Sequence, residues 1–405
     1  MYKNQSSKAL LIITITSCIV VSILIYIVLF TSCLNNAEKH RLQNKIVGLL
    51  GSDSGEKYDL RGLSDADVFI PERIEEIEMV NFEMNSAKTI TVAENNKSYY
   101  SKNNCVLERE SNKLILACVN SIIPKETTYI SAKAFYNIEN SSKSVVLYEG
   151  TLEDWMNLQF EAESPGYYFE RVIFVNENKE KYEIEKISLP DDWTYVSDYR
   201  FCNFRSVKEI ELNNVQTIGE FAFANCALVE ELYVPDTVTK IGDGAFKGLE
   251  KLEKISLPFV GLAQENEDYF GSIFYKASSS ANSYVPDSIK EVIIRNEDSI
   301  CANAFRGCEK IETIELNGNI KSIGEKAFSH CTNLKKLVIP GTLEVLGWRV
   351  LNDSNDLEVY YGNTFEHFLS VYKKEQKPTN GFVCNKFYEF DNGEYKLVSD
   401  FKLDN

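Results

Sequence analysis

Residues 234–257 read VPDTVTKIGDGAFKGLEKLEKISL, and this stretch holds one complete copy of the motif that governs most of the protein. An aliphatic-Pro pair opens the copy, an Ile-Gly pair and an Ala-Phe pair follow, and a Leu-x-x-Ile-x-Leu segment closes it. The alternation in the closing segment predicts a short strand with one buried face. Proline ends the strand because it cannot donate to a ladder, and glycine allows a tight bend where neighbouring segments approach closely.

The motif recurs with a period of 23 residues, which separates Phe223 from Phe246, Phe305 from Phe328, and Phe328 from Leu351. Weaker copies pair Ile130 with Ala134 and Phe135, Val196 with Phe201, and Ile77 with Phe82. A segment this short cannot bury its own apolar face, so the period predicts a solenoid whose coils stack and whose strands align in a parallel sheet. Phe246 is accordingly expected in the core.

The order Ile-Gly-x-x-Ala-Phe-x-x-Cys-x-x-Leu-x-x-Ile-x-Leu-Pro resembles the hallmark of the BspA-type leucine-rich-repeat family. The resemblance covers roughly residues 68–372, with inserts near 93–121, 139–183 and 259–287. It implies an α/β-type repeat solenoid, a leucine-rich-repeat arc with one short parallel β-strand per coil. It also implies an extracellular surface protein or adhesin with no enzymatic activity of its own.

An uncharged, apolar run extends from Ala9 to Cys33. At about 1.5 Å per residue, a helix of that length crosses a hydrocarbon core of roughly 30 Å. The sequence therefore predicts a short cytoplasmic N-terminus (1–8), a transmembrane signal-anchor (9–33), a juxtamembrane helix and linker (34–67) and an ectodomain outside the cell. The alternative is a lipoprotein anchored at Cys33, which ends a lipobox-like Phe-Thr-Ser-Cys sequence. Residues 373–405 are expected to form a strand-rich C-terminal cap or a tail.

Charge and composition limit the functional classes. The protein has 43 Lys and Arg against 60 Asp and Glu, a net charge of −17, which argues against nucleic acid as a partner. With only 3 His, no CxxC and no phosphate-binding glycine loop, no catalytic, cofactor or metal site is predicted. A carboxylate-based glycosidase and an envelope scaffold without a dedicated ligand stay as alternatives to non-enzymatic binding of an extracellular protein or glycan.

The cysteines fall into two groups. Cys226, Cys308 and Cys331 follow the motif Phe by three residues, in a slot that Phe204 and Leu249 occupy in other coils, so they are expected to pack as core residues. Cys105 and Cys118 flank an expected hairpin, across which a disulfide is geometrically allowed. The eight ectodomain cysteines otherwise show no disulfide framework.

The middle positions of the strands should form a column that points away from the core. The sequence places in this column Glu211, Tyr233, Ser256, Ile293, Glu315, Val338 and Glu358. Solenoids use such extended faces to bind ligands, although an ordinary half-polar sheet surface would look the same. The predicted ligand-binding residues are Tyr233, Ile293, Val338, Glu211 and Glu315, together with Ser279 in a Ser-rich insertion expected beside the column.

The predicted orientation has a direct test. Protease added to intact cells should remove the ectodomain, because all residues after Cys33 are expected outside. An ectodomain that stays protected until the membrane is opened would contradict this topology.

Overall fold

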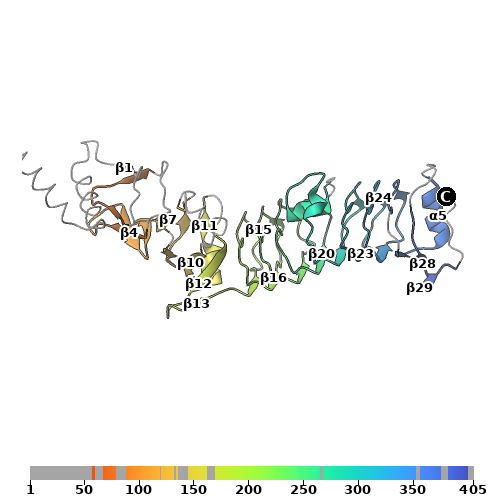
Figure 1. The fold of residues 1–405 in the computed structure, drawn as a ribbon, viewed down its shortest axis with the longest axis horizontal. Coiled ribbons are helices and arrows are strands. Elements are labelled where there is room, and N and C mark those ends of the chain that lie inside the picture. The colour runs from red at the N-terminus through yellow and green to blue at the C-terminus, as the bar shows by residue number, and fades with distance from the viewer. Residues whose placement is uncertain are drawn as a thin grey trace, which may run out of the picture. The chain divides into compact units, whose positions relative to one another are not determined.

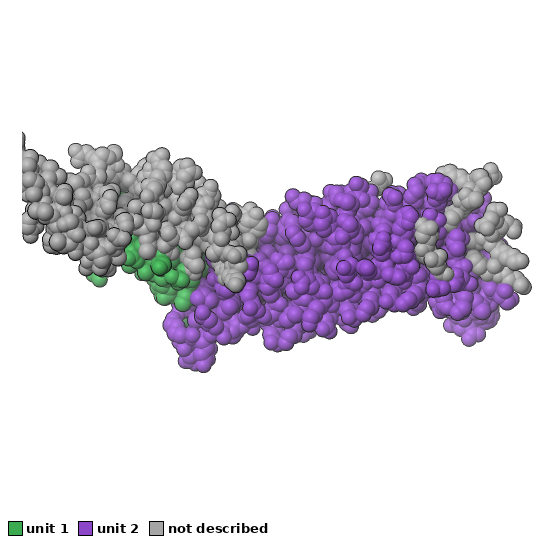
Figure 2. Space-filling model, viewed as in Figure 1, with its two compact units in different colours: residues 1–141 green, residues 142–405 purple. Residues whose placement is uncertain are grey.

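The computed structural model describes residues 57–59, 67–78, 88–118, 120–131, 134–135, 145–161, 169–264, 268–352, 356–374 and 382–399. The protein separates into two compact units, residues 1–141 and 142–405 (Figure 2). The predicted segments 1–8 and 9–33 lie outside the described residues, as does most of 34–67. Within the described ranges, no helix has the length and apolar character needed to cross a membrane.

The first unit consists of short strands. They are β1 (Lys57–Asp59), β2 (Asp67–Ile70), β3 (Glu76–Glu78), β4 (Thr89–Val92), β5 (Tyr99–Lys102), β6 (Cys105–Glu108), β7 (Lys113–Ala117), β8 (Ile122–Ile123) and β9 (Tyr129–Ile130). Parallel pairs form between β1 and β3, and between β2 and β4, whereas β5, β6 and β7 form an antiparallel meander. This meander lies within the segment near residues 93–121 that the family resemblance identifies as an insert.

The second unit begins with β10 (Val145–Glu149), α3 (Leu152–Asn157), β11 (Gln159–Phe160), β12 (Arg171–Val175) and β13 (Lys181–Tyr182). Thr151 caps α3 through a reciprocal capping box with Asp154, and Trp155 is the buried residue of this helix. The Trp155 indole N–H donates to the Arg200 carbonyl at 3.0 Å, which ties α3 to the first solenoid coils.

Each solenoid coil carries one longer strand, and six of the eight coils carry a shorter strand as well in the residues that the structure describes. The longer ones are β14 (Lys186–Ser188), β16 (Glu209–Glu211), β18 (Glu231–Tyr233), β20 (Lys254–Leu257), β21 (Glu291–Ile294), β23 (Thr313–Leu316), β25 (Lys336–Ile339) and β27 (Glu358–Tyr361). The shorter ones are β15 (Tyr195–Val196), β17 (Thr217–Ile218), β19 (Lys240–Ile241), β22 (Ser299–Ile300), β24 (Ser322–Ile323) and β26 (Val345–Leu346). The longer strands lie along one side of the unit and the shorter strands along the other (Figure 1).

This architecture confirms a repeat solenoid and corrects two details of the prediction. Most coils contain two strands rather than one, and no α-helix occurs in the described residues between β12 and β27. The turn after each Ile-Gly pair includes a residue with positive φ, such as Phe221 (51°), Gly244 (62°) or Lys326 (56°). A right-handed helix cannot continue through that conformation. The fold is therefore a β-solenoid rather than an α/β repeat.

The register of the strands reproduces the 23-residue period. Leu232 pairs with Ile255, and Ile314 pairs with Leu337, in parallel. The main sheet has the order β18-β20-β21-β23-β25-β27-β28-β29, where β28 (Lys386–Asp391) and β29 (Glu394–Leu397) close its C-terminal end. The shorter strands form two further parallel sheets, β15-β17-β19 and β22-β24-β26.

The core is a column of stacked phenylalanines between the two strand layers. Ring centroids lie 5.3 Å apart for Phe201 and Phe223, 6.2 Å for Phe223 and Phe246, and 5.5 Å for Phe305 and Phe328. These five side chains are fully buried. Each coil therefore buries its apolar side chains against its neighbours, as the period predicts.

The Gly of the Ile-Gly pair allows this close stacking. A Cβ atom on Gly242 would lie 2.4 Å from the Glu220 backbone nitrogen in the preceding coil, and one on Gly324 would lie 2.4 Å from the Ala302 nitrogen. A side chain at either position would force the coils apart. Cys301 occupies the equivalent position next to the insertion, where its Sγ lies 3.1 Å from the Asp268 carbonyl oxygen.

The insertion near residues 259–287 lengthens one coil, so that Ile255 pairs with Val292. It contains two 3-10 helices, η2 (Phe270–Phe274) and η3 (Ala281–Tyr284). Phe270 continues the core column, 5.0 Å from Phe305. The buried Asn282 accepts from Gly271 N–H at 2.8 Å and donates to the Ala304 carbonyl at 3.1 Å, which fixes the insertion to the next coil.

Helix α5 (Phe365–Lys374) lies beside the last coil. Its Phe368 is buried and contacts Tyr361 at 5.3 Å and Phe387 at 4.8 Å between ring centroids. Strand β28 then adds in parallel to β27, and β29 returns antiparallel after a turn at Asn392 and Gly393, both with positive φ. Strands β28 and β29, within residues 373–405, thus extend the main sheet.

Truncation of Phe246 tests the stacked core. Phe246→Ala should lower the free energy of unfolding by about 3–5 kcal/mol, the usual cost of truncating a buried aromatic side chain. The matched control is Tyr195→Ala, since Tyr195 is exposed and a surface substitution changes stability by only about 0.5 kcal/mol. Denaturant unfolding monitored by circular dichroism measures both, and equal losses would contradict the stacking argument.

Candidate functional site

The exposed face of the main sheet carries a continuous column of side chains defined by strand register. The column reads Tyr233, Ser256, Ile293, Glu315, Val338, Tyr360, Tyr388 and Leu397. Five of these positions were predicted. Glu211 lies outside the main sheet, on β16, where it pairs with Ser188 of β14 and accepts from the Lys186 ammonium at 2.6 Å.

Glu358 does not belong to the column, which corrects the prediction. It pairs with Lys336, and Tyr360 takes the position beside Val338. Glu358 and Tyr360 are two residues apart and share one face of β27, so the alternation of the sequence could not separate them. A spacing of 23 residues would place Tyr361 beside Val338. The last coil is one residue shorter, so Tyr360 lies there instead.

Arg295 covers the N-terminal end of the column. Its guanidinium carbon lies 4.2 Å from the centre of the Tyr233 ring, and its Nη2 lies 2.8 Å from Asp236 Oδ1. Arg295 also donates to Ser256 Oγ and to the Val234 carbonyl. The Tyr233 residue is still 56% exposed, but one face of its ring is occupied, and Ser256 is buried. Tyr233 is therefore less available to a ligand than its position in the sequence suggests.

A row of ion pairs runs beside the column. Lys254 Nζ lies 2.7 Å from Glu291, Lys336 Nζ lies 2.7 Å from Glu315, and Lys386 pairs with Glu358. The hydrogen bond from Lys386 lowers the pKa of the Glu358 carboxyl, and the hydrogen bond to Glu291 raises the pKa of Lys254. Exposed pairs of this kind contribute little to stability. They do neutralise one another, so this face of the sheet carries no strong local charge.

The C-terminal end of the column is aromatic, and we call it the C-terminal aromatic cluster: Tyr360, Tyr388, Phe390, Tyr395 and Leu397. Tyr360 and Tyr388 stack at 4.4 Å with an interplanar angle of 4°, and Tyr395 meets the Tyr360 ring edge-on at 5.3 Å. Phe390, Tyr395 and Leu397 are 39%, 42% and 55% exposed. Burial and the hydrogen bond to Glu358 raise the pKa of Tyr360 to about 12, so its hydroxyl stays protonated.

The cluster was not predicted, because residues 373–405 lie beyond the last clear repeat. A signal was present: aromatic and aliphatic residues alternate with polar ones on both sides of the Asn-Gly turn at 392–393, as in a hairpin with two unlike faces.

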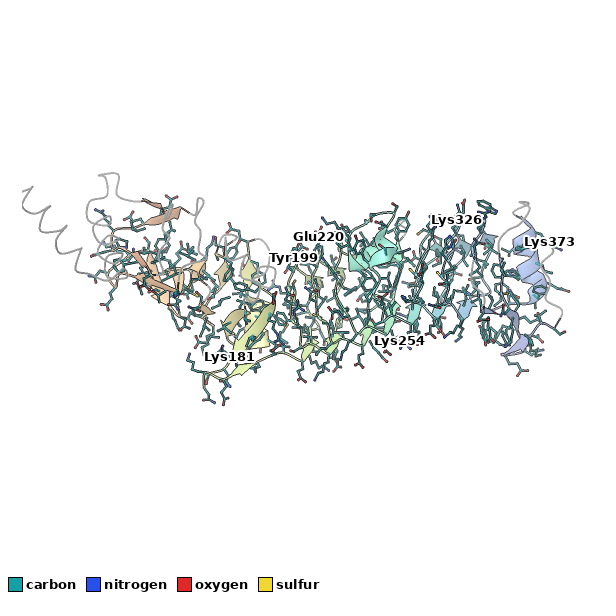
Figure 3. All side chains as sticks on the ribbon, viewed as in Figure 1. Lys181, Tyr199, Glu220, Lys254, Lys326 and Lys373 are labelled. Carbon is teal, nitrogen blue, oxygen red and sulfur yellow. The ribbon has the colours of Figure 1, made fainter. Side chains whose placement is uncertain are left out.

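Ser279 is exposed but does not lie beside the column. The insertion packs on the turn after β19, where Ala277 N–H donates to Asp243 Oδ1 at 3.0 Å. Tyr275 and Tyr284 of the insertion stack at 3.9 Å, and Lys247 Nζ lies 5.2 Å from the Tyr275 ring. Figure 3 shows the two sides of the unit, with Lys254 on the sheet side and Glu220 on the turn side. The structure thus separates Ser279 from Tyr233, Ile293 and Val338.

None of the described cysteines forms a disulfide. Cys226, Cys308 and Cys331 are buried in the core slot, and burial raises their pKa, to about 12 for Cys331. Cys105 and Cys118 are also unpaired, which corrects the suggested disulfide: Cys105 lies opposite Ala117 in the register, and Ser121 Oγ contacts Cys118 Sγ instead. Among the described residues, no group of three His, Cys, Asp or Glu side chains could hold a metal ion.

Short parallel strands stacked at this spacing, with an Ile, Ala and Phe core, define a leucine-rich-repeat solenoid. Residues 175–293 and 273–370 match the family model described as "BspA type Leucine rich repeat region", with six copies. The repeat region therefore belongs to the BspA-type leucine-rich-repeat family, which confirms the resemblance seen in the sequence.

Solved structures of bacterial leucine-rich-repeat proteins are similar to this protein at low identity. A leucine-rich repeat protein from Bacteroides ovatus is 21% identical, with a TM-score of 0.41, and the match covers 74% of this sequence and 72% of that one. A leucine-rich cell surface protein from Faecalibacterium prausnitzii is 17% identical, with a TM-score of 0.29 and coverage of 78% and 85%. The pneumococcal vaccine antigen PcpA is 16% identical, with a TM-score of 0.28 and coverage of 76% and 75%. No curated protein matches the sequence.

The state of the thiols has a chemical test. N-ethylmaleimide should leave Cys105, Cys226, Cys308 and Cys331 unlabelled in the folded protein, because burial both shields them and raises their pKa. All four should react after unfolding in guanidinium without a reductant, as peptide mass mapping will show. The half-buried Cys384 serves as the internal comparison. A peptide pair joined through Cys105 and Cys118 would contradict the assignment.

Proposed function

We propose that this protein is a membrane-anchored extracellular binding protein, without enzymatic activity, whose main sheet binds a partner protein through the C-terminal aromatic cluster. One observation carries the proposal: tyrosine, phenylalanine and leucine side chains are gathered and exposed on one rigid sheet face. Tyrosine is enriched at interaction hot spots because it supplies a large contact area at low entropic cost.

The family is consistent with this role, since BspA-type leucine-rich-repeat proteins are surface proteins and generally not enzymes. The anchoring rests on the uncharged run at residues 9–33. The outside orientation rests on the acidic balance of the long remainder of the sequence, which is consistent with translocation.

The ring geometry favours a protein over a glycan. Sugars stack on exposed aromatic faces, but Tyr360 and Tyr388 cover each other with parallel planes, and the Lys336 ammonium lies 5.6 Å from the Tyr360 ring centre. Arg295 occupies one face of Tyr233 in the same way. Rings that stand side by side present edges and hydroxyl groups, which suit the side chains and backbone of a partner protein.

The net charge of the protein adds a preference among partner proteins. A net charge of −17 creates a field that accelerates the approach of basic partners and repels anionic polymers. Because the ion pairs beside the column neutralise one another, the charge is expected to act on the association rate more than on the final contact. We therefore expect a partner with an apolar anchor flanked by basic residues.

The test is a soluble ectodomain, residues 34–405, probed against arrays of cell-surface proteins and of glycans. For the protein partner so found, replacing Tyr360 and Tyr388 together with Ser should weaken affinity by at least about tenfold, the effect of losing more than about 1.4 kcal/mol at a hot spot. Surface plasmon resonance measures the change.

The matched control replaces Tyr195 and Tyr284 with Ser, since both are exposed but lie outside the main sheet. Circular dichroism should show that both double variants stay folded. Unchanged affinity in the folded Tyr360 and Tyr388 variant would move the site away from the cluster, and binding only to glycans would overturn the choice of partner class.

A further inference from the structure

The outer edge of β29 carries backbone groups for which the described residues provide no hydrogen-bond partner. In the described part of the main sheet, β29 is the last strand and pairs only with β28. Val398 N–H donates to the Phe387 carbonyl at 2.9 Å, and hydrogen-bonded pairs alternate along an antiparallel ladder. The N–H and C=O groups of Glu394 and Lys396 therefore point toward β28. Those of Tyr395 and Leu397 point away from the sheet.

This edge is complementary to itself. When two β29 strands run antiparallel with the two-fold axis at Tyr395, Glu394 of each copy lies opposite Lys396 of the other. The outward N–H and C=O groups of Tyr395 in the two copies then meet each other across the axis, and Leu397 of each copy faces the turn residue Gly393 of the other. Moving the axis by one residue to Glu394 or Lys396 would place like charges opposite each other, which is unfavourable. The charge pattern thus selects one register.

The faces of the two hairpins also match. Phe390, Tyr395 and Leu397 lie on the same exposed face, whereas Glu394 and Lys396 lie on the other, where Lys396 Nζ is 2.8 Å from Asp391 Oδ2. Pairing along β29 would bring two copies of this apolar face together and bury part of it. The strand contains no proline and its register with β28 is regular. It is short and carries Glu394 and Lys396, but in this register each of these charges lies opposite a residue of the other sign.

We propose that two copies of this protein pair antiparallel along β29, about a two-fold axis at Tyr395, and join their main sheets into one. The interface is isologous, because the same strand serves both copies. The pairing sets two C-terminal aromatic clusters side by side on one continuous sheet face. A partner with two binding segments would then be held by avidity in addition to single-site affinity.

Cysteine cross-linking of the full-length protein in detergent tests the register. Opposed residues of a hydrogen-bonded antiparallel pair have Cα atoms about 5.5 Å apart, within the range that a disulfide spans. Under mild oxidation, Tyr395→Cys should form a reductant-sensitive dimer at twice the monomer mass of 46.2 kDa. Glu394→Cys and Lys396→Cys should form little dimer alone, but should link to each other when the two variants are mixed. Wild-type protein gives the background from the native cysteines.

Proline substitution provides a second, independent measurement. Leu397→Pro removes an outward N–H group and no hydrogen bond within the monomer, so the dimer should be lost in analytical ultracentrifugation while the thermal unfolding temperature is unchanged. The proposal is overturned if Tyr395→Cys links no more than wild type, if Lys396→Cys links to itself as readily, or if folded Leu397→Pro stays dimeric. Tyr395 and Leu397 also belong to the C-terminal aromatic cluster, so these variants test pairing alone, through cross-linking and mass. The binding function is tested separately, by the affinity of the Tyr360 and Tyr388 variant.

Discussion

Every coil of the solenoid depends on contact with its neighbours, because one coil has too few apolar side chains to enclose a core of its own. Phe201, Phe223 and Phe246 can stack only if successive backbones approach closely, and Gly219 and Gly242 permit that approach because they have no Cβ atom to clash with the preceding coil. The distance between coils, the hydrogen-bond register of their strands and the packing of the core therefore all depend on this close approach. A change of length in one coil must be absorbed locally, as the insertion does by returning Phe270 to the core column.

The stacking of equivalent coils explains which structural features could be predicted from the sequence. A repeat provides internal comparison, so residues in phase can be assigned to the core from the sequence alone: Phe246, Cys226, Cys308 and Cys331 are all buried. The predictions that failed concerned contacts between residues that do not occupy equivalent positions in the repeat. No period predicts that Arg295 lies over Tyr233, or that the insertion packs on the turn side away from the column. The shorter strands, such as β17 and β19, are only two residues long, which is too short to produce a visible alternation of apolar and polar residues in the sequence.

The residues on the exposed face of the sheet are less constrained by the repeat than the residues of the core. Core positions repeat because each must match the position above and below it, whereas outward positions are free to vary from coil to coil. They vary here without a regular trend: Tyr233 lies beneath Arg295, Glu315 pairs with Lys336, and Tyr360 stacks on Tyr388. Aromatic side chains are gathered only at the C-terminal end of the described column, where the proposed partner would find its anchor.

At the end of a solenoid, both the apolar core and the edge of the sheet would be exposed to solvent. In this protein two different elements cover them. The last coil would expose its core, and α5 covers it with Phe368 and Val371. The last strand would expose a parallel edge, and β28 and β29 replace that edge with an antiparallel hairpin. A hairpin does not remove the edge; it moves the unpaired backbone groups to β29 and changes their direction. An antiparallel edge can pair with an identical strand by simple two-fold rotation, since a strand and its rotated copy run in opposite directions. The hairpin that closes the main sheet is thus also the element through which the proposed pairing would join two copies.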